Sequence, residues 1–191
     1  MLALPPAPAP APRRQVLVGT ALFCGAAAML VGAMTALWFR FRDNAGTTVW
    51  KPKKVIIPEV ATNTMWITAF LACVMIQWVV YSAKRGDRQH TAVGLGIVMI
   101  LGLAHLNSQA YVWKKVALPV KGDTAYNSMF YAITGTLFVL VVVGIVYALV
   151  GAFRYIGGRT KDRETLSGLA LYWYFLAALN TAVWFTVYVT K

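Results

Sequence analysis

Residues 61–87 read ATNTMWITAFLACVMIQWVVYSAKRGD, and this stretch decides the fold class. Its run from Asn63 to Ala83 contains no charged residue and is long enough to cross about 30 Å of hydrocarbon at about 1.5 Å per residue. A basic turn from Lys84 to Arg88 follows, and a second apolar run extends from Thr91 to Trp113. A turn this short forces the two predicted helices into an antiparallel hairpin.

Three further apolar runs flank this hairpin, so the chain is predicted to be an all-α membrane protein with five transmembrane helices in a bundle. The first run is too long for a signal-peptide core and is interpreted as a retained helix. Residues 1–14 are rich in Pro and Ala and are predicted to form a disordered tail, and residues 15–191 a single transmembrane domain. The predicted helices cover about 16–39, 63–83, 91–113, 126–152 and 166–189.

Composition agrees with a membrane protein, because 59% of the residues are hydrophobic and only 13% are charged. The net charge of +12 comes from Lys and Arg in short segments between the apolar runs, which indicates membrane topology rather than nucleic-acid binding. Cys24 and Cys73 are too far apart for a CxxC redox or metal pair and are interpreted as packing residues.

Five spans place the two termini on opposite sides of the membrane. Positive charge divides evenly between the sides, but cations in short loops carry the most weight, so the compact turn from Lys84 to Arg88 favours a cytoplasmic N-terminus. Six tryptophans lie mostly near predicted helix ends, where their rings are expected to meet lipid headgroups: Trp38, Trp50, Trp66, Trp78, Trp113 and Trp173.

The distribution of ionisable residues argues against independent chemistry. All six acids fall in predicted loops, and no Lys or Arg lies deep within a predicted span, which counts against a self-contained transporter, channel or pump. His90 and His105 are about 22 Å apart on one helix, so they cannot both ligate one haem. His105 is expected to form an interhelical hydrogen bond, with Asn107, Ser108 and Gln109 extending a polar patch.

Polar and small residues within the spans predict protein contacts. Polar groups are costly to desolvate in lipid, so six side chains are expected to point toward protein: Asn63, Gln77, Ser108, Gln109, Thr134 and Asn180. Glycines permit close backbone approach within the bundle or against a partner, and they recur in three of the predicted helices: Gly25, Gly32, Gly94, Gly96, Gly102, Gly135, Gly144 and Gly151.

Several segments resemble, in the same order, subunit III of the haem-copper oxidases in its short five-helix bacterial form. Residues 61–87 resemble the family's Asn-Thr helix start and its basic hairpin turn, and GLAHLNSQAY at 102–111 resembles its third helix. SMFYAITG at 128–135 is similar to the family's Ser-Leu-Phe-Tyr…Thr-Gly segment. Tyr172, Trp173 and Phe175 stand where its Tyr-Trp-His-Phe motif begins the last helix.

The chain also departs from the family pattern at positions that usually carry polar residues. The family's first-helix Glu has no counterpart among residues 21–25, and Leu137 and Leu140 replace histidines. Tyr174 replaces the His of the last-helix motif, and Ala177 stands where an Asp is expected.

The resemblance implies a non-redox accessory subunit that packs on catalytic subunit I and other oxidase subunits, binds membrane lipid, and supports stability and proton uptake in an aerobic respiratory chain. It implies no cofactor and no catalytic or metal-binding residue in this chain, with haems and copper in the partner subunits of a bacterial inner-membrane complex. Seven residues are expected to make structural polar or aromatic contacts: Asn63, Gln109, Ser128, Tyr131, Thr134, Tyr172 and Trp173.

Three alternatives remain open at this stage. One accessory fold can serve different catalytic partners, so a subunit III-like protein of a nitric-oxide reductase or a quinol oxidase is the first. A small stand-alone membrane transporter is the second, although the sequence shows no inverted repeat or midplane charge. A di-haem membrane anchor is the third, and the single deep histidine opposes it.

Overall fold

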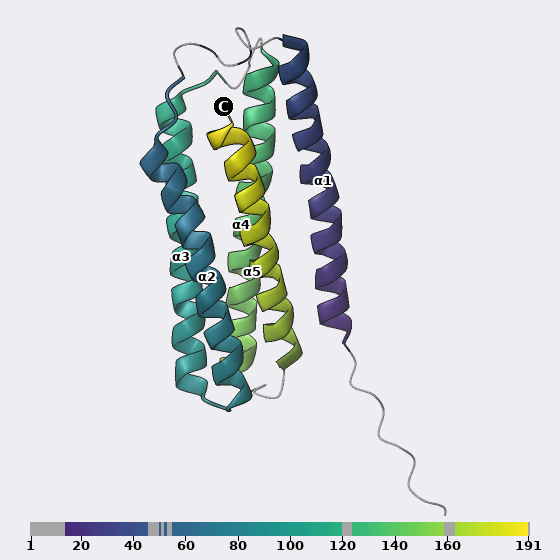
Figure 1. Ribbon diagram of the computed structural model, residues 1–191. Helices are drawn as coiled ribbons and strands as arrows, with labels where there is room; N and C mark the ends of the chain where they lie inside the picture. The colour runs from purple at the N-terminus through teal and green to yellow at the C-terminus, as the bar shows by residue number, and fades with distance from the viewer. Residues whose placement is uncertain are drawn as a thin grey trace, which may run out of the picture.

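Five long helices lie side by side along a common axis in the computed structural model, which describes residues 14–45, 50, 52, 55–119, 124–158 and 163–190 (Figure 1). The described residues include no strand. This confirms the prediction of an all-α five-helix bundle. The helices are α1 (Gln15–Ala45), α2 (Glu59–Lys84), α3 (Arg88–Val116), α4 (Ala125–Ile156) and α5 (Arg163–Val183), and α5 continues into the π-helix η1 (Trp184–Val189).

All five helices are long and apolar enough to cross a membrane, and the protein is a multi-pass membrane protein. Each helix extends past its predicted apolar run; α2, for instance, begins at Glu59 rather than Asn63, and α4 ends at Ile156 rather than Ala152. Hydropathy marks only the hydrocarbon-spanning part, whereas backbone hydrogen bonding carries the helix into the headgroup zone. Of the predicted tail, residues 1–13 lie outside the described residues.

The α2–α3 hairpin turns at Gly86, whose φ of 77° lies in the left-handed region that favours glycine. Asp87 then caps α3, because its carboxylate Oδ1 accepts a hydrogen bond of 3.0 Å from the His90 backbone N–H. That bond holds the pKa of the Asp87 carboxyl below its ordinary value. The basic turn recognised in the sequence therefore has a fixed geometry.

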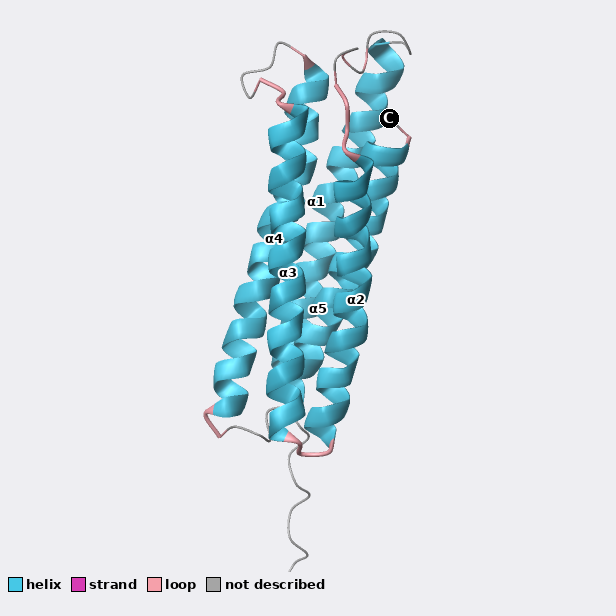
Figure 2. Cartoon of the chain, turned by 90° about the vertical axis from the view of Figure 1, so that its left-hand side faces the viewer, coloured by secondary structure: helices cyan, strands magenta, loops and turns pink. Residues whose placement is uncertain are grey.

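α5 is the most buried helix and packs against α1, α2 and α4, while α3 packs on α2 and α4. Figure 1 shows α5 at the front of the bundle between α2 and α1. The view turned by 90° again shows the helices lying side by side (Figure 2). α1 is the most exposed helix. Its buried residues are Cys24, Ala27, Val31 and Trp38.

A carboxylate from α5 satisfies the first turn of α1. The backbone N–H groups of Val16 and Leu17 donate to Glu164 Oε1 over 2.7 Å and 3.3 Å. The first N–H groups of a helix have no partner within the helix, and its N-terminus carries partial positive charge, so an acidic oxygen is favourable there. Glu164 therefore fixes the start of α1 against the start of α5.

Three glycines provide the close approaches that the sequence predicted. A Cβ added at Gly94 would lie 2.6 Å from Val79 Cγ2, one at Gly102 would lie 2.8 Å from Ile145 Cγ1, and one at Gly144 would lie 3.0 Å from Tyr172 Cε1. No atom lies within 4 Å of such a Cβ at Gly25, Gly32, Gly96 or Gly135. Only part of the glycine pattern therefore serves packing inside the described bundle.

The interfacial expectation is wrong for Trp38, Trp50 and Trp173, which are buried. Trp38 and Trp50 meet edge to face with ring centroids 5.0 Å apart, and both rings pack on Tyr126. Position near a helix end does not show which way a ring points. This aromatic cluster, Trp38, Trp50 and Tyr126, joins the end of α1 to the start of α4.

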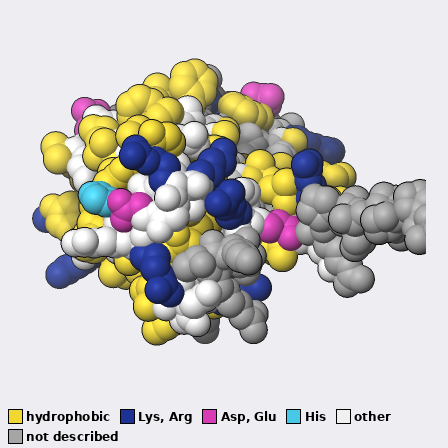
Figure 3. Space-filling model, turned by 90° about the horizontal axis from the view of Figure 1, so that it is seen from below, with side chains coloured by type: hydrophobic (Ala, Val, Ile, Leu, Met, Phe, Trp, Pro, Cys, Tyr) yellow, Lys and Arg dark blue, Asp and Glu magenta, His cyan; other side chains and the backbone are white. Residues whose placement is uncertain are grey.

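The opposite end of the bundle, which holds the start of α1 and the α2–α3 turn, is rich in cations (Figure 3). Two guanidinium groups join helices there: Arg88 donates to the Ile156 carbonyl oxygen over 3.3 Å, and Arg163 donates to the Lys84 carbonyl oxygen over 3.4 Å. Both acceptors lie at helix C-termini, where carbonyl groups have no partner within the helix.

Candidate functional site

The candidate site consists of polar side chains that join the helices to one another. Thr134 is fully buried on α4; it accepts a hydrogen bond of 3.0 Å from Trp113 Nε1 of α3 and donates to the Phe130 carbonyl oxygen over 2.6 Å. Tyr131, one turn earlier, donates over 2.9 Å to the carbonyl oxygen of Leu118, just past the end of α3. Two of the predicted residues thus hold α4 against α3.

Gln109 joins α3 to the end of α5. Its Oε1 accepts a hydrogen bond of 3.1 Å from the Tyr188 hydroxyl, and both side chains are buried. Tyr188 lies in the π-helix, where the wider turn changes the direction of the side chains relative to an α-helix. Sequence reasoning found Gln109 but missed Tyr188, because a π-helical turn has no hydropathy signature.

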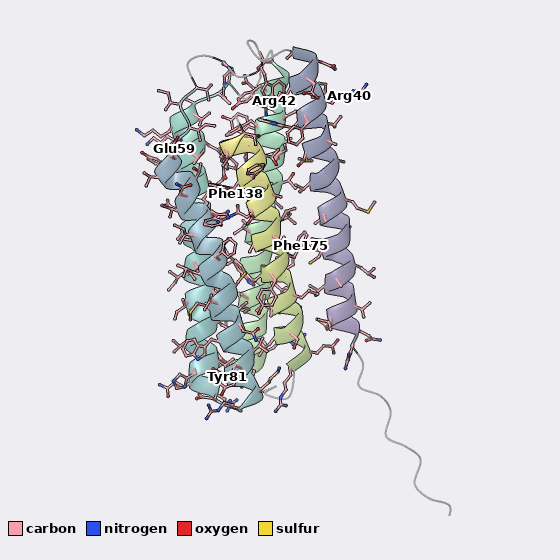
Figure 4. All side chains as sticks on the ribbon, in the orientation of Figure 1. Arg40, Arg42, Glu59, Tyr81, Phe138 and Phe175 are labelled. Atoms are coloured by element: carbon pink, nitrogen blue, oxygen red, sulfur yellow. The ribbon has the colours of Figure 1, made fainter. Side chains whose placement is uncertain are left out.

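Tyr172 and Trp173 pack α5 against the other helices. The Tyr172 hydroxyl donates over 2.8 Å to the Leu140 carbonyl oxygen of α4, and the backbone oxygen of Trp173 accepts a hydrogen bond of 3.5 Å from Cys73 Sγ of α2. Both rings lie against the glycines described above, Tyr172 at Gly144 and Trp173 at Gly102. Tyr172 also contacts Phe175, which Figure 4 shows on the side of α5 toward α1.

His105 makes the interhelical contact expected of it. Its ring Nδ1–H donates to the Met65 carbonyl oxygen of α2 over 3.1 Å, and Asn180 of α5 reaches the same oxygen at 3.5 Å. His90 lies at the other end of α3 beside Asp87, with 2.5 Å between Nδ1 and the carboxylate oxygen. Within the part of the chain that the structure describes, no three His, Cys, Asp or Glu side chains are grouped to hold a metal ion.

The other two predicted residues lie on the surface. Asn63 is exposed on α2, and its Oδ1 accepts a hydrogen bond of 3.3 Å from Trp184 Nε1. Ser128 is exposed in the first turns of α4 and is not brought together with the others. The seven predicted residues therefore divide into three groups. Gln109, Thr134, Tyr172 and Trp173 are buried, Tyr131 is half-buried, and Asn63 and Ser128 are exposed.

Comparison with known proteins identifies the family of the chain. Residues 44–191 match the family described as cytochrome c oxidase subunit III. The chain belongs to this family.

The similar relatives carry the same description. The cytochrome c oxidase subunit 3 of Drosophila yakuba is 26% identical over 145 residues, which are 74% of this chain and 53% of that protein. The probable cytochrome c oxidase subunit 3 of Rickettsia bellii is 24% identical over 193 residues, covering 93% and 69%. The cytochrome c oxidase subunit 3 of Corynebacterium diphtheriae is 23% identical over 179 residues, covering 91% and 87%. The chain spans about half the length of the first relatives it matches.

Most of the residues at which the chain departs from the subunit III family pattern are apolar and buried. Leu137 and Leu140 are buried in α4, and Ala177 is buried in α5. On α1, Cys24 is the buried residue of the window from residue 21 to 25. Tyr174 differs from the rest because it is 40% exposed and donates a hydrogen bond to Gln77 Oε1 of α2.

Proposed function

We propose that this chain is a non-redox accessory subunit of a haem-copper terminal oxidase, which packs on catalytic subunit I and the other oxidase subunits and supports their stability and proton uptake. The observation that carries the proposal is the subunit III family match over residues 44–191, which takes in α2 to α5 and η1. In this role the haems and copper belong to the partner subunits, and oxygen reduction occurs there.

The way the polar groups are used supports a structural role. Thr134 bonds a side chain of α3, Tyr172 bonds the backbone of α4, and Gln109 bonds a side chain of η1. These bonds join helices and do not line a continuous path. Proton pumps and ion-coupled transporters place ionisable residues within their spans. The acids of the described residues lie at the ends of helices instead: Glu59 and Glu164 in first turns, Asp87 at the N-cap of α3 and Asp43 near the end of α1.

We infer a bacterial inner membrane as the location, with the N-terminus in the cytoplasm and membrane lipid around the bundle. The compact basic turn between α2 and α3, with Lys84, Arg85 and Arg88, supports this orientation through the excess of cations in short cytoplasmic loops. Reporter fusions at each terminus test it. Alkaline phosphatase activity at the C-terminal fusion and none at the N-terminal fusion is expected, and the reverse pattern contradicts the assignment.

The test of function is affinity purification of the tagged chain in mild detergent, followed by a reduced-minus-oxidised optical spectrum, mass identification of the co-eluting proteins and oxygen-consumption measurements. A haem-bearing polytopic partner with oxygen-consuming activity is the expected result. An unrelated polytopic protein with the same tag controls for detergent carry-over.

Other outcomes would assign other functions. A co-eluting nitric-oxide reductase, recognised by its haem types and subunit masses, would replace the oxidase as partner. A colourless chain that elutes alone from membranes known to contain the oxidase would contradict the accessory role and favour a stand-alone transporter.

A further inference from the structure

The outer surface of α4 has the composition expected of a helix that faces lipid, and the other helix surfaces can be compared with it. From Val139 to Ile156, each exposed residue of α4 is apolar: Val139, Val142, Val143, Val146, Leu149, Val150, Phe153 and Ile156. Apolar side chains have no hydrogen bonds to lose, so their contact with acyl chains costs no free energy.

The surface formed by α2 and α5 is different, because a polar pair lies exposed within the spans. Tyr174 of α5 donates a hydrogen bond to Gln77 Oε1 of α2, and both side chains are exposed. Gln77 precedes the helix end at Lys84 by seven residues, about 10 Å along the axis, and Tyr174 follows Arg163 by eleven, about 16 Å. Both residues therefore lie within the hydrocarbon of a bilayer about 30 Å thick.

This pair retains hydrogen-bonding capacity. The Gln77 amide nitrogen has two N–H donors and no hydrogen-bond partner among the described residues, and the Tyr174 oxygen can still accept a bond. Acyl chains offer neither donors nor acceptors, so exposure of these groups to lipid costs free energy. A neighbouring protein helix can satisfy them through a backbone carbonyl or a polar side chain.

The shape of the same surface suits a helix. Ala178 and Ala182 are exposed at one-turn spacing after Tyr174 on α5, and small residues at this spacing let a second helix approach closely. α5 lies between α1 and α2 at the front of the bundle in Figure 1, so an approaching helix would meet α5 directly. We name the surface formed by Gln77, Tyr174, Ala178 and Ala182 the α2–α5 face.

We propose that the α2–α5 face docks a membrane-spanning helix of the haem-bearing catalytic subunit, and that this helix presents a hydrogen-bond acceptor to the Gln77 amide. The inference rests on the proposed function and adds the surface through which the two subunits meet. The outer surface of α4 then faces lipid in the assembled complex.

A matched pair of tryptophan substitutions tests this assignment in the whole complex. Ala178→Trp places a large ring on the α2–α5 face, and Val146→Trp places the same ring on α4. Haem recovered per tagged subunit is expected to fall about tenfold for Ala178→Trp, because the ring overpacks the docking surface. It is expected to stay at the unmodified level for Val146→Trp.

A second measurement keeps the test decisive if Ala178→Trp fails to accumulate in membranes. The double variant Gln77→Leu/Tyr174→Phe changes the bulk of the surface only slightly and is expected to lower haem retention about threefold, which corresponds to one intramembrane hydrogen bond. A photocrosslinking residue at position 178 is expected to attach to the catalytic subunit, and one at position 146 to lipid.

The opposite results overturn the inference. These are loss of haem from Val146→Trp with retention by Ala178→Trp, or crosslinks at position 178 to lipid or to a second copy of this chain only. Failure of the proposed function itself is distinguishable, because the unmodified chain would then carry no haem-bearing partner in any of these experiments.

Discussion

α4 and α5 are neighbouring membrane spans, yet the residues on their exposed surfaces differ. From Val139 to Ile156, the outer surface of α4 is apolar, and the helix places Thr134 and Gly144 on its inner side. α5 is buried over most of its length, and its remaining exposed strip carries Tyr174 and two alanines beside Gln77 of α2. Hydropathy alone scores both as membrane spans, whereas the three-dimensional distribution of small and polar groups separates a lipid-facing surface from a protein-facing one.

The largest effect is expected at the inner side of α4. Leu at position 144 would collide with Tyr172 and Leu176, since even a Cβ there would lie 3.0 Å and 3.1 Å from their side-chain atoms. Gly144→Leu should lower the free energy of unfolding by about 3 kcal/mol. Detergent-induced unfolding followed by circular dichroism measures it.

The matched control is Gly135→Leu on the same helix, where nothing lies within 4 Å of an added Cβ. It should leave unfolding nearly unchanged. Equal destabilisation by the two variants would mean that the two sides of α4 do not differ in packing.

The next effect concerns the hydrogen bond on the inner side of α4. Thr134→Val keeps the shape of the side chain but leaves the Trp113 indole N–H without its acceptor, at a cost of about 2 kcal/mol. Thermal unfolding in detergent reports the loss. Ser128→Ala, at the exposed start of α4, is expected to change the stability by less than about 0.5 kcal/mol, and a larger change there would assign Ser128 a contact that the described bundle does not contain.

A smaller effect is expected for the polar pair of the α2–α5 face in the isolated subunit. Gln77→Leu removes the bond from Tyr174, and intramembrane hydrogen bonds contribute about 0.6 kcal/mol on average. Unfolding of the purified chain measures this contribution. A loss above about 2 kcal/mol would show that the pair chiefly holds α2 to α5, because intramembrane bonds rarely exceed about 1.7 kcal/mol, and the contrast with α4 would weaken.

The smallest effect belongs to the turn that sets the α2–α3 pair. Asp87→Ala removes the cap on α3, and hydrogen exchange at the amides of residues 88–91 should become faster, whereas Asp87→Asn should preserve slow exchange because the amide oxygen also caps. Unchanged exchange in Asp87→Ala would mean that packing, not the cap, holds this turn.

The same carboxyl has a pH dependence of known sign. The His90 backbone N–H lowers the pKa of the Asp87 carboxyl in the folded chain. The ionised carboxylate therefore stabilises the folded state fully above the unfolded-state pKa of about 3.9, and this stabilisation is lost as the pH falls through the lower folded-state pKa.

Much of the candidate site could be predicted from sequence, but its partners could not. Thr134 and Gln109 were found because polar groups within an apolar run must bond to protein, whereas Tyr172 was found through the resemblance to the family's last-helix motif. Their partners Trp113, Tyr188 and Leu140 depend on which helices meet, and Tyr188 also depends on a π-helical turn. Trp38 and Trp50 show the opposite failure, because their place near helix ends indicated the membrane interface while packing buried both.

The sequence by itself determined the fold class and the five spans, because the hydrocarbon thickness imposes a length of apolar helix that can be read one residue at a time. The family was indicated separately, by motifs that resemble it in the same order along the chain. Tertiary structure alone decided which glycines pack, which tryptophans are buried and which side of each helix faces outward. These properties depend on the rotation of each helix about its axis relative to its neighbours. Five nearly uniform apolar helices carry little periodic signal for that rotation, so only the contacts between them fix it.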